Sequence, residues 1–277
     1  ELHDDKFMVF DQGKRVFTPL FLVLVLVGLV SARARGGPGP TSEPERSKAR
    51  IRPWIRAAAP IVVLLALYGS LDLVNGLGAV PIHDRLVRHW EISIFGAEVS
   101  RLWWQASPNP AWSTVSHMAY MSYYIVVPAP LLVFLFQRRG AALDRATTAI
   151  MAAFVACYLC FIFFPVAGPY YEYPRPAAWF LDNFAARLSY GILAGGSSFG
   201  AAFPSSHVAA TWAAAGGAWM ANRRLGLLLG VGATLLTIAV VYCQMHYAVD
   251  AIAGVAVAAG ALVVAGALHR PVRTDSL

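Results

Sequence analysis

The sequence predicts an all-α protein that crosses a membrane several times. Of its 277 residues, 58% are hydrophobic and only 13% are charged, which is too apolar for a domain whose surface faces water. Several apolar runs meet or approach the roughly 20 residues that a helix needs to cross the hydrocarbon core. No internal repeat and no strand of useful length is evident. The predicted fold class is therefore a polytopic transmembrane helical bundle.

Seven apolar runs predict seven membrane-spanning helices. Their lengths fit the hydrocarbon core, and the fifth is the shortest. We expect the first run to be retained as a span, because Arg33 and Arg35 follow it instead of a small-residue cleavage site. The expected spans are residues 16–32, 58–78, 112–136, 146–166, 207–221, 225–244 and 248–268.

A stretch rich in Gly, Pro, Ser and Arg separates the first span from the other six. Its composition cannot bury a core, so it predicts a linker. Six helices then form the functional core, and one N-terminal transmembrane helix stands apart from them. The expected regions are an N-terminal segment with the first span (1–32), a basic cytoplasmic linker (33–57), a six-helix membrane domain (58–268) and a cytoplasmic tail (269–277).

The positions of the basic residues predict the orientation of the bundle. Short loops rich in Lys and Arg are retained on the cytoplasmic side. The linker, the loop 138–145, the turn Arg223-Arg224 and the tail are basic, and they alternate correctly with seven spans. We therefore expect a multi-pass protein of the cell (plasma) membrane with a cytoplasmic C-terminus. Residues 79–111, residues 167–206 and the turn near residue 245 then lie on the extracytoplasmic side.

The charges predict a lipid bilayer rather than nucleic acid as the surrounding partner. The net charge of +7 is scattered among apolar segments instead of being collected on one soluble face. Residues 81–104 mix large apolar side chains with charges, which is typical of an interfacial amphipathic helix. The apolar set is Trp90, Ile94, Phe95, Leu102, Trp103 and Trp104, and the charged set is Arg85, Arg88, Glu91, Glu98 and Arg101.

The segment Phe203-Pro204-Ser205-Ser206-His207 opens the fifth expected span after a Gly and Ser-rich approach. Backbone amides at a helix N-terminus bind phosphate oxygens, and the helix dipole adds partial positive charge there. The hydroxyls of Ser205 and Ser206 lie beside these amides. The segment therefore predicts a phosphate-binding turn.

His246 and Asp250 stand four residues apart where the sixth and seventh spans meet. If this junction is helical, both side chains lie on one face. A carboxylate that holds one imidazole nitrogen as N–H leaves the other nitrogen free as a nucleophile toward phosphorus. His207, across the phosphate, is suited to protonate the leaving oxygen. The expected topology puts all three costly ionisable groups at the same membrane face.

These residues resemble the type 2 phosphatidic acid phosphatase (PAP2) superfamily of integral membrane lipid phosphatases and phosphotransferases built on six helices. The matching stretches are Pro204-Ser205-Ser206-His207 and His246-Tyr247-x-x-Asp250, and the resemblance spans roughly residues 80–260. It implies that His207 is the acid and that His246 is a nucleophile oriented by Asp250.

The sequence departs from the fuller family pattern at two places. Gly168 stands where the family often has Lys, and Ala239-Val240 replaces a Ser-Arg pair. Arg175 is the best remaining cation for phosphate, because a guanidinium binds phosphate oxygens bidentately. This reduced pattern is similar to the branch of inositol phosphorylceramide synthases, and so is the segment Glu91–Gly96.

Other polar and aromatic residues have two readings each. Tyr170, Tyr171 and Tyr173 precede Arg175 and either contact a lipid headgroup or form an aromatic belt at the membrane interface. His117 in the third span either lines the pocket or satisfies helix contacts. The three cysteines, all in or beside apolar runs, are expected to be packing residues; they are Cys157, Cys160 and Cys243.

The sequence thus predicts an enzyme that moves a phosphate group on or off a phospholipid or polyprenyl phosphate through a phosphohistidine, without a cofactor or a metal. The acceptor is water in a phosphatase, or a polar alcohol such as inositol in a headgroup transferase. Three alternatives stay open: a transporter that uses the ionisable residues as a relay, a zinc hydrolase with His207, His246 and Asp250 as ligands, and a non-catalytic lipid-binding protein.

Overall fold

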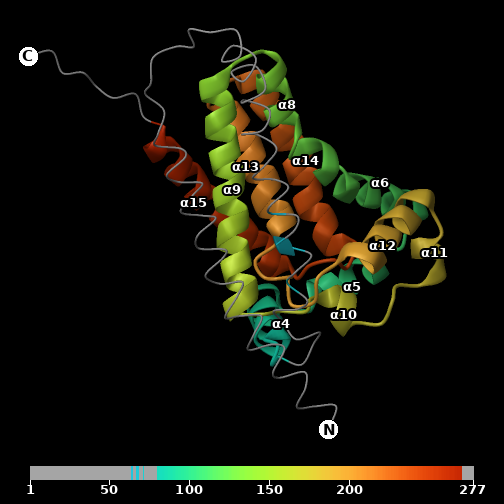
Figure 1. The fold of residues 1–277 in the computed structure, drawn as a ribbon. Coiled ribbons are helices and arrows are strands. Elements are labelled where there is room, and N and C mark those ends of the chain that lie inside the picture. Colours follow the sequence, from blue (N-terminus) through green and yellow to red (C-terminus); the bar gives the residue numbers. More distant parts are fainter. Residues whose placement is uncertain (1–63, 65–66, 69–70, 72–79, 270–277) are drawn as a thin grey trace, which may run out of the picture.

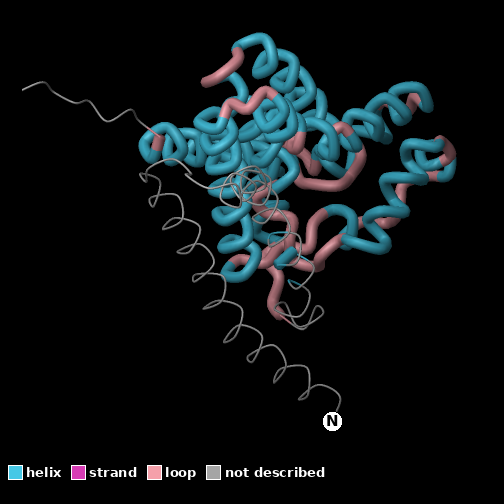
Figure 2. Tube along the Cα trace, turned by 45° about the horizontal axis from the view of Figure 1, so that its top comes forward, coloured by secondary structure: helices cyan, strands magenta, loops and turns pink. Residues whose placement is uncertain are grey.

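A computed structural model of the chain describes residues 64, 67–68, 71 and 80–269. The expected first span, the linker, most of the second span and the tail from residue 270 lie outside the described residues. The described residues form helices joined by loops (Figures 1 and 2), with a single isolated β-bridge and no named strand among them. The all-α fold class is therefore confirmed. The helices are α4 (Asp84–Phe95), α5 (Val99–Ala106), α6 (Pro110–Met121), α7 (Tyr123–Val126), α8 (Ala129–Phe136), α9 (Gly140–Phe163), α10 (Pro169–Glu172), α11 (Ala178–Leu181), α12 (Phe184–Gly196), α13 (Ser206–Trp219), α14 (Arg223–Tyr242) and α15 (Ala248–Leu268).

Within the described part of the chain, four stretches are long and apolar enough to cross a membrane. They are Pro110–Phe136, which comprises α6 to α8, and the single helices α9, α14 and α15. The first of these is interrupted, because the Ser122 hydroxyl donates to the Ala119 carbonyl at 2.6 Å and Pro128 has no N–H to continue the ladder. Figure 1 shows α6 diverging from the direction of α8.

Helix α13 occupies the centre of the bundle. It corresponds to the fifth expected span and is short, as the sequence predicts. It is 14 residues long and rich in Ala and Gly, and most of its residues are buried. It packs against α9, α14 and α15 (Figure 1). A Cβ at Gly217 would lie 3.0 Å from Cα of Ala146 in α9, so the glycine favours the close approach of these two helices.

The segments expected on the extracytoplasmic side contain more helix than the sequence predicts. Residues 167–206, expected as a loop, include α10, α11 and α12. Asn183 starts α12 by accepting a hydrogen bond from the Ala186 amide at 2.8 Å, and the helix packs against α6. The expected single amphipathic helix is two helices, α4 and α5, because Gly96 ends α4 with a positive φ of 75°.

The basic segments gather at one end of the bundle. Arg139 donates to the Ala221 carbonyl at 3.0 Å, and Arg145 donates to the His269 carbonyl at 3.3 Å. These contacts join the start of α9, the α13–α14 turn and the end of α15. Helices α4, α5 and α10 and the start of α15 lie at the opposite end (Figure 1). The candidate site is therefore separated from the basic end by the length of the bundle.

Candidate active site

His246 lies in a loop between α14 and α15. The helical junction that was one possibility from the sequence is therefore not formed. Helix α14 ends at Tyr242, and Gln244 turns the chain with a positive φ of 57°. The amides of Met245 and His246 both donate to the Val240 carbonyl at 3.0 Å, which closes the turn. His246 and Asp250 still meet, although helical register is not the cause.

Asp250 lies in the first turn of α15 and points back toward the loop. Its Oδ2 accepts a hydrogen bond from the Tyr247 amide at 2.8 Å and lies 3.4 Å from Nδ1 of His246. The carboxylate therefore caps the helix and touches the imidazole with the same oxygen. Its other oxygen, Oδ1, is buried without a hydrogen-bond partner among the described residues.

Backbone and carboxylate together fix the orientation of the His246 ring. Nδ1 lies 3.1 Å from the Ala202 carbonyl in addition to its contact with Asp250. Both neighbours are acceptors, so Nδ1 carries the hydrogen and Nε2 carries a lone pair. Burial lowers the pKa of His246 to about 4, so the ring is neutral at pH 7. A neutral, oriented imidazole with a free Nε2 is the form that a nucleophile requires.

His207 faces His246 from the first turn of α13. The two ring centroids are 5.7 Å apart. The Tyr120 hydroxyl lies 3.3 Å from Nε2 of His207, and the rings of Tyr120 and Tyr123 are 5.2 Å and 4.5 Å from the His207 ring. Nδ1 of His207 is buried without a hydrogen-bond partner in the described part of the chain. The two tyrosines were missed, because nothing in their span distinguishes them from lipid-facing aromatics.

Ser205 and Ser206 begin α13 as predicted, but one of the expected phosphate ligands is already engaged. The Ser205 hydroxyl caps the helix by accepting from the Val208 amide, and the Ser205 amide donates to the Asp250 carbonyl at 3.0 Å. Both serines are buried. The amides of Ser206 and His207 lie in the first turn, where a helix offers them no acceptor.

Gly168, which stands where the family often has Lys, lies against the loop that holds His246. The strand-like contact of Val166 with Ala201 brings residues 166–168 beside residues 200–202. Gly168 has a φ of 89°, and a Cβ there would lie 2.7 Å from the Cβ of Ala202. The Ala202 carbonyl contacts His246, so a larger residue at 168 would displace the group that orients the imidazole.

Arg175 is exposed on the loop after α10 and rests on two tyrosine rings. Its guanidinium carbon lies 5.4 Å from the Tyr170 ring and 5.6 Å from the Tyr190 ring, and it donates to the Tyr170 hydroxyl at 3.2 Å. The Tyr190 hydroxyl in turn donates to the Cys243 carbonyl of the His246 loop. No carboxylate of the described residues pairs with Arg175, which leaves its charge available to an anion.

Gln244 connects the segment that carries Arg175 to the His246 loop. The sequence did not indicate this role. Its amide oxygen accepts from Trp104 Nε1 at 2.9 Å, and its amide nitrogen donates to the Pro174 carbonyl at 3.0 Å. These partners lie 140 and 70 residues away in the chain. Local sequence could therefore not reveal that Gln244 sets the position of Arg175 relative to His246.

Asp84 is a second buried residue that braces the His246 loop. Its carboxylate accepts from the amides of Ala167 and Gly168 at 2.7 Å each, and from the Tyr247 hydroxyl at 3.0 Å. It therefore joins the loop at Gly168 to the residue that follows His246. A buried carboxylate with three donors is well satisfied, although no described residue forms an ion pair with it.

Glu91 corrects the expectation that the charges of α4 face the membrane interface. It is fully buried, and its carboxylate accepts from the Ala248 amide at 2.8 Å and from the Ser100 hydroxyl at 3.0 Å. It thereby caps α15, the helix that carries Asp250. Burial raises the pKa of Glu91. The missed signal is the i, i+3, i+7 spacing of Asp84, Val87 and Glu91, which puts all three on one helix face.

The other residues predicted to contact the substrate do not gather in one place. Tyr170 meets Arg175, whereas Tyr171 bonds to Ser197. Tyr173 is buried between the guanidinium groups of α4 and α5. His117 is buried, with Nδ1 2.8 Å from the Ser113 carbonyl and its ring against Phe180.

The described residues form no site suited to cysteine or metal chemistry. The three cysteines are free, and Cys157 and Cys243 are buried among core side chains. Among residues 80–269 and the few described before them, no three His, Cys, Asp or Glu side chains form a metal-binding group.

The fold and site together define a helical membrane protein with two neighbouring histidines, a half-buried His207 and a buried His246 that is held by a carboxylate. Residues 93–264, more than half of the chain, match the PAP2 superfamily, so the chain belongs to that superfamily. Membership indicates a phosphatase- or phosphotransferase-type lipid function in a membrane. No curated protein and no solved structure shows significant similarity to the chain.

Proposed function

We propose that the protein transfers a phosphoryl or phosphodiester group from a membrane lipid to an acceptor through a phosphohistidine on His246. The observation that carries the proposal is the orientation of the His246 ring. Nδ1 is held by the Ala202 carbonyl and Asp250, Nε2 has no hydrogen-bond partner among the described residues, and the ring centroid lies 5.7 Å from that of His207. The free nitrogen is the nucleophile, and His207 is the acid.

The reaction has two balanced steps. In the first, Nε2 of His246 forms a bond to phosphorus and the bond from phosphorus to the leaving oxygen breaks. The imidazolium form of His207, which takes up its proton when the anionic phosphate binds beside it, gives that oxygen the proton. Asp250 stabilises the positive charge that develops on the imidazole. In the second, an acceptor hydroxyl gives its proton to His207 and attacks phosphorus, and the phosphorus–nitrogen bond breaks. With water as the acceptor, a phosphoryl group gives free phosphate and a phosphodiester group gives a phosphomonoester; with an alcohol, the products are a new phosphomonoester and a new phosphodiester, respectively.

Arg175 binds the phosphate oxygens in this proposal. Its side chain carries no competing ion pair within the described chain, and Gln244 and Tyr190 connect its segment to the His246 loop. The first-turn amides of α13 complete the anion site. With Gly168 and Val240 at the family's other cationic positions, Arg175 supplies the cation near the leaving group.

Replacing Arg175 with Ala is expected to lower kcat/KM by about 10²- to 10³-fold, the usual cost of removing one donor to transition-state charge. Arg175→Lys should recover part of the loss, because an ammonium keeps the charge but not the bidentate geometry. Steady-state kinetics on the purified enzyme measure both. Arg187→Ala is the matched control, since Arg187 is exposed on α12 and pairs with Asp182. Equal values of kcat/KM in Arg175→Ala and Arg187→Ala would show that Arg175 does not bind the phosphate.

The membrane orientation is part of the proposal. The site lies at the end of the bundle opposite the basic segments around Arg139, Arg145 and Arg223. Basic segments stay in the cytoplasm. The active site then faces the extracytoplasmic side of the plasma membrane, and the C-terminus is cytoplasmic.

The substrate and acceptor are tested together. Purified protein in detergent is incubated with phosphatidic acid, other phospholipids and polyprenyl phosphates, each with and without inositol. Phosphate release identifies hydrolysis. An inositol phosphate that forms only when inositol is added identifies transfer to this alcohol. Absence of turnover with every lipid would contradict the proposed function and favour a transport or lipid-binding role.

A further inference from the structure

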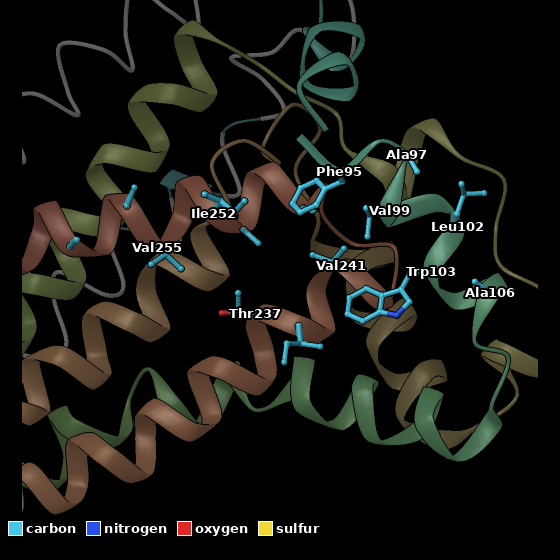
Figure 3. A pocket seen from close by; sticks show the side chains of 15 residues that line it. Phe95, Ala97, Val99, Leu102, Trp103, Ala106, Thr237, Val241, Ile252 and Val255 are labelled. Atoms are coloured by element: carbon cyan, nitrogen blue, oxygen red, sulfur yellow. The ribbon is translucent and has the colours of Figure 1, made fainter. Parts of the chain in front are cut away.

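A groove with a volume of about 970 Å³ lies between α5, α14 and α15 (Figure 3). None of the described residues that line it is charged. Large apolar side chains form its walls, with Phe95 and Trp103 at the α4–α5 end and Ile252 and Val255 along α15. The single hydroxyl in the lining, that of Thr237, donates to the Ala233 carbonyl at 2.7 Å. The groove therefore offers an occupant apolar contact alone.

Small residues on α15 create this space. Helices α14 and α15 both pack on α13, and Ala251, Ala256 and Ala259 line the gap between them. Helix α5 covers the end of the gap next to the site. Since the side chains of α15 are too short to close the seam, the groove stays open between two packed helices.

The groove opens to the hydrocarbon core of the membrane. Its two long walls, α14 and α15, are both long and apolar enough to be membrane spans. A polar occupant would be desolvated there without a hydrogen-bond partner, at a cost of several kcal/mol per group. Trp103, near the end of the bundle that carries the site, is the residue type that marks a membrane interface. An occupant must therefore be a hydrocarbon chain.

The length of the groove matches one leaflet of the bilayer. Along α15 it extends from Ala248 to Ala259, which is roughly 16 Å at about 1.5 Å per residue. The hydrocarbon core is about 30 Å thick, so half of it is close to this length. An acyl chain spans one leaflet, whereas a polyprenyl chain is longer. The length of the groove therefore fits an acyl chain better than a polyprenyl chain.

The end of the groove at Ala248 and Ala251 adjoins the reactive residues in sequence and in space. Ala248 begins α15, directly after the His246 loop, and Ala251 follows Asp250. A lipid whose chain lies along the groove would have its headgroup at the N-terminus of α15. We propose that this groove binds an acyl chain of a glycerophospholipid substrate; the proposal rests on the lipid phosphate transfer described above.

Chain-length selectivity tests the groove. Phosphatidic acids with long and short acyl chains are compared as substrates in wild type, Val255→Trp and Val263→Trp. Both valines are on α15, but only Val255 lines the groove, and Val263 is 72% exposed. Val255→Trp should lower the ratio of long-chain to short-chain kcat/KM by at least about tenfold, since several methylenes lose their contacts. Val263→Trp should leave the ratio as in wild type. Equal ratios in the two variants would overturn the proposal.

A binding measurement keeps the groove testable if no phospholipid is turned over, an outcome that contradicts the proposed function instead. Phosphatidic acid with a photoactivatable diazirine near the end of one acyl chain is crosslinked to the wild-type protein and mapped by mass spectrometry. Labelling should concentrate on groove residues such as Leu102 and Val255, and excess unlabelled phosphatidic acid should compete it away. Labelling that does not saturate and is as strong at Leu228, an exposed residue outside the groove, would refute the site. Competition by polyprenyl phosphate alone would refute the acyl chain.

Discussion

Replacing His246 with Gln is expected to lower turnover by at least about 10³-fold, the scale on which loss of a nucleophile acts. Gln lacks a nitrogen that can attack phosphorus, because its amide lone pair is delocalised. Its NH₂ group can still donate to the Ala202 carbonyl, which now lies 3.1 Å from Nδ1 of His246, so the loop should keep its shape. Initial rates with the lipid found to be the best substrate measure the effect.

Thermal unfolding in detergent distinguishes lost chemistry from lost structure. The melting temperature of His246→Gln should stay within a few degrees of wild type. His89→Gln is the matched control, since His89 is an exposed histidine on α4, at the same end of the bundle, and its rate should not change. A His246→Gln enzyme that is well folded and as active as His89→Gln would show that another residue attacks the phosphate.

Replacing Asp250 with Asn is expected to lower kcat by about 10²-fold with little change in KM. In hydrolases of the Ser-His-Asp type, this substitution costs about 10⁴-fold through the wrong imidazole tautomer. Here the Ala202 carbonyl also holds Nδ1 of His246, so the tautomer survives and mainly the stabilisation of the imidazolium is lost. An Asn oxygen can still accept from the Tyr247 amide, which preserves the start of α15.

The split between kcat and KM is the informative readout for Asp250. A group that acts only as charge develops changes kcat, whereas a group that binds the ground state changes KM. Asp182→Asn is a suitable control, because Asp182 is exposed and pairs only with Arg187 in the described structure. A loss confined to KM in Asp250→Asn would assign this carboxylate to substrate binding.

The long helices were predictable because their apolar character is continuous. Helices α14 and α15 begin and end within two residues of the expected spans, and α9 begins six residues before and ends three residues before its expected span. Helix α12 was not predicted, since its start depends on the Asn183 cap and its stability on packing against α6. These features depend on tertiary neighbours that a hydropathy pattern does not contain.

The proximity of the candidate site residues was predictable for those that stand in short motifs. His207, His246 and Asp250 stand in two such motifs, and the structure brings them together. Their geometry has a different origin from the one inferred, because a capping carboxylate and a carbonyl, rather than helical register, orient His246. Gln244 could not be identified, because Trp104 lies 140 residues away in the chain, whereas the burial of Glu91 had a local signal in the spacing of Asp84, Val87 and Glu91.

The covalent intermediate is the most direct test of the account. Purified enzyme is mixed with a substrate labelled with ³²P in its transferable phosphate and quenched within the first turnover under alkaline conditions, which preserve phosphohistidine. The labelled site is then mapped by mass spectrometry. The account predicts label on His246, lost on acid treatment and absent in His246→Gln. Label on another residue, or full turnover without any labelled protein, would contradict it.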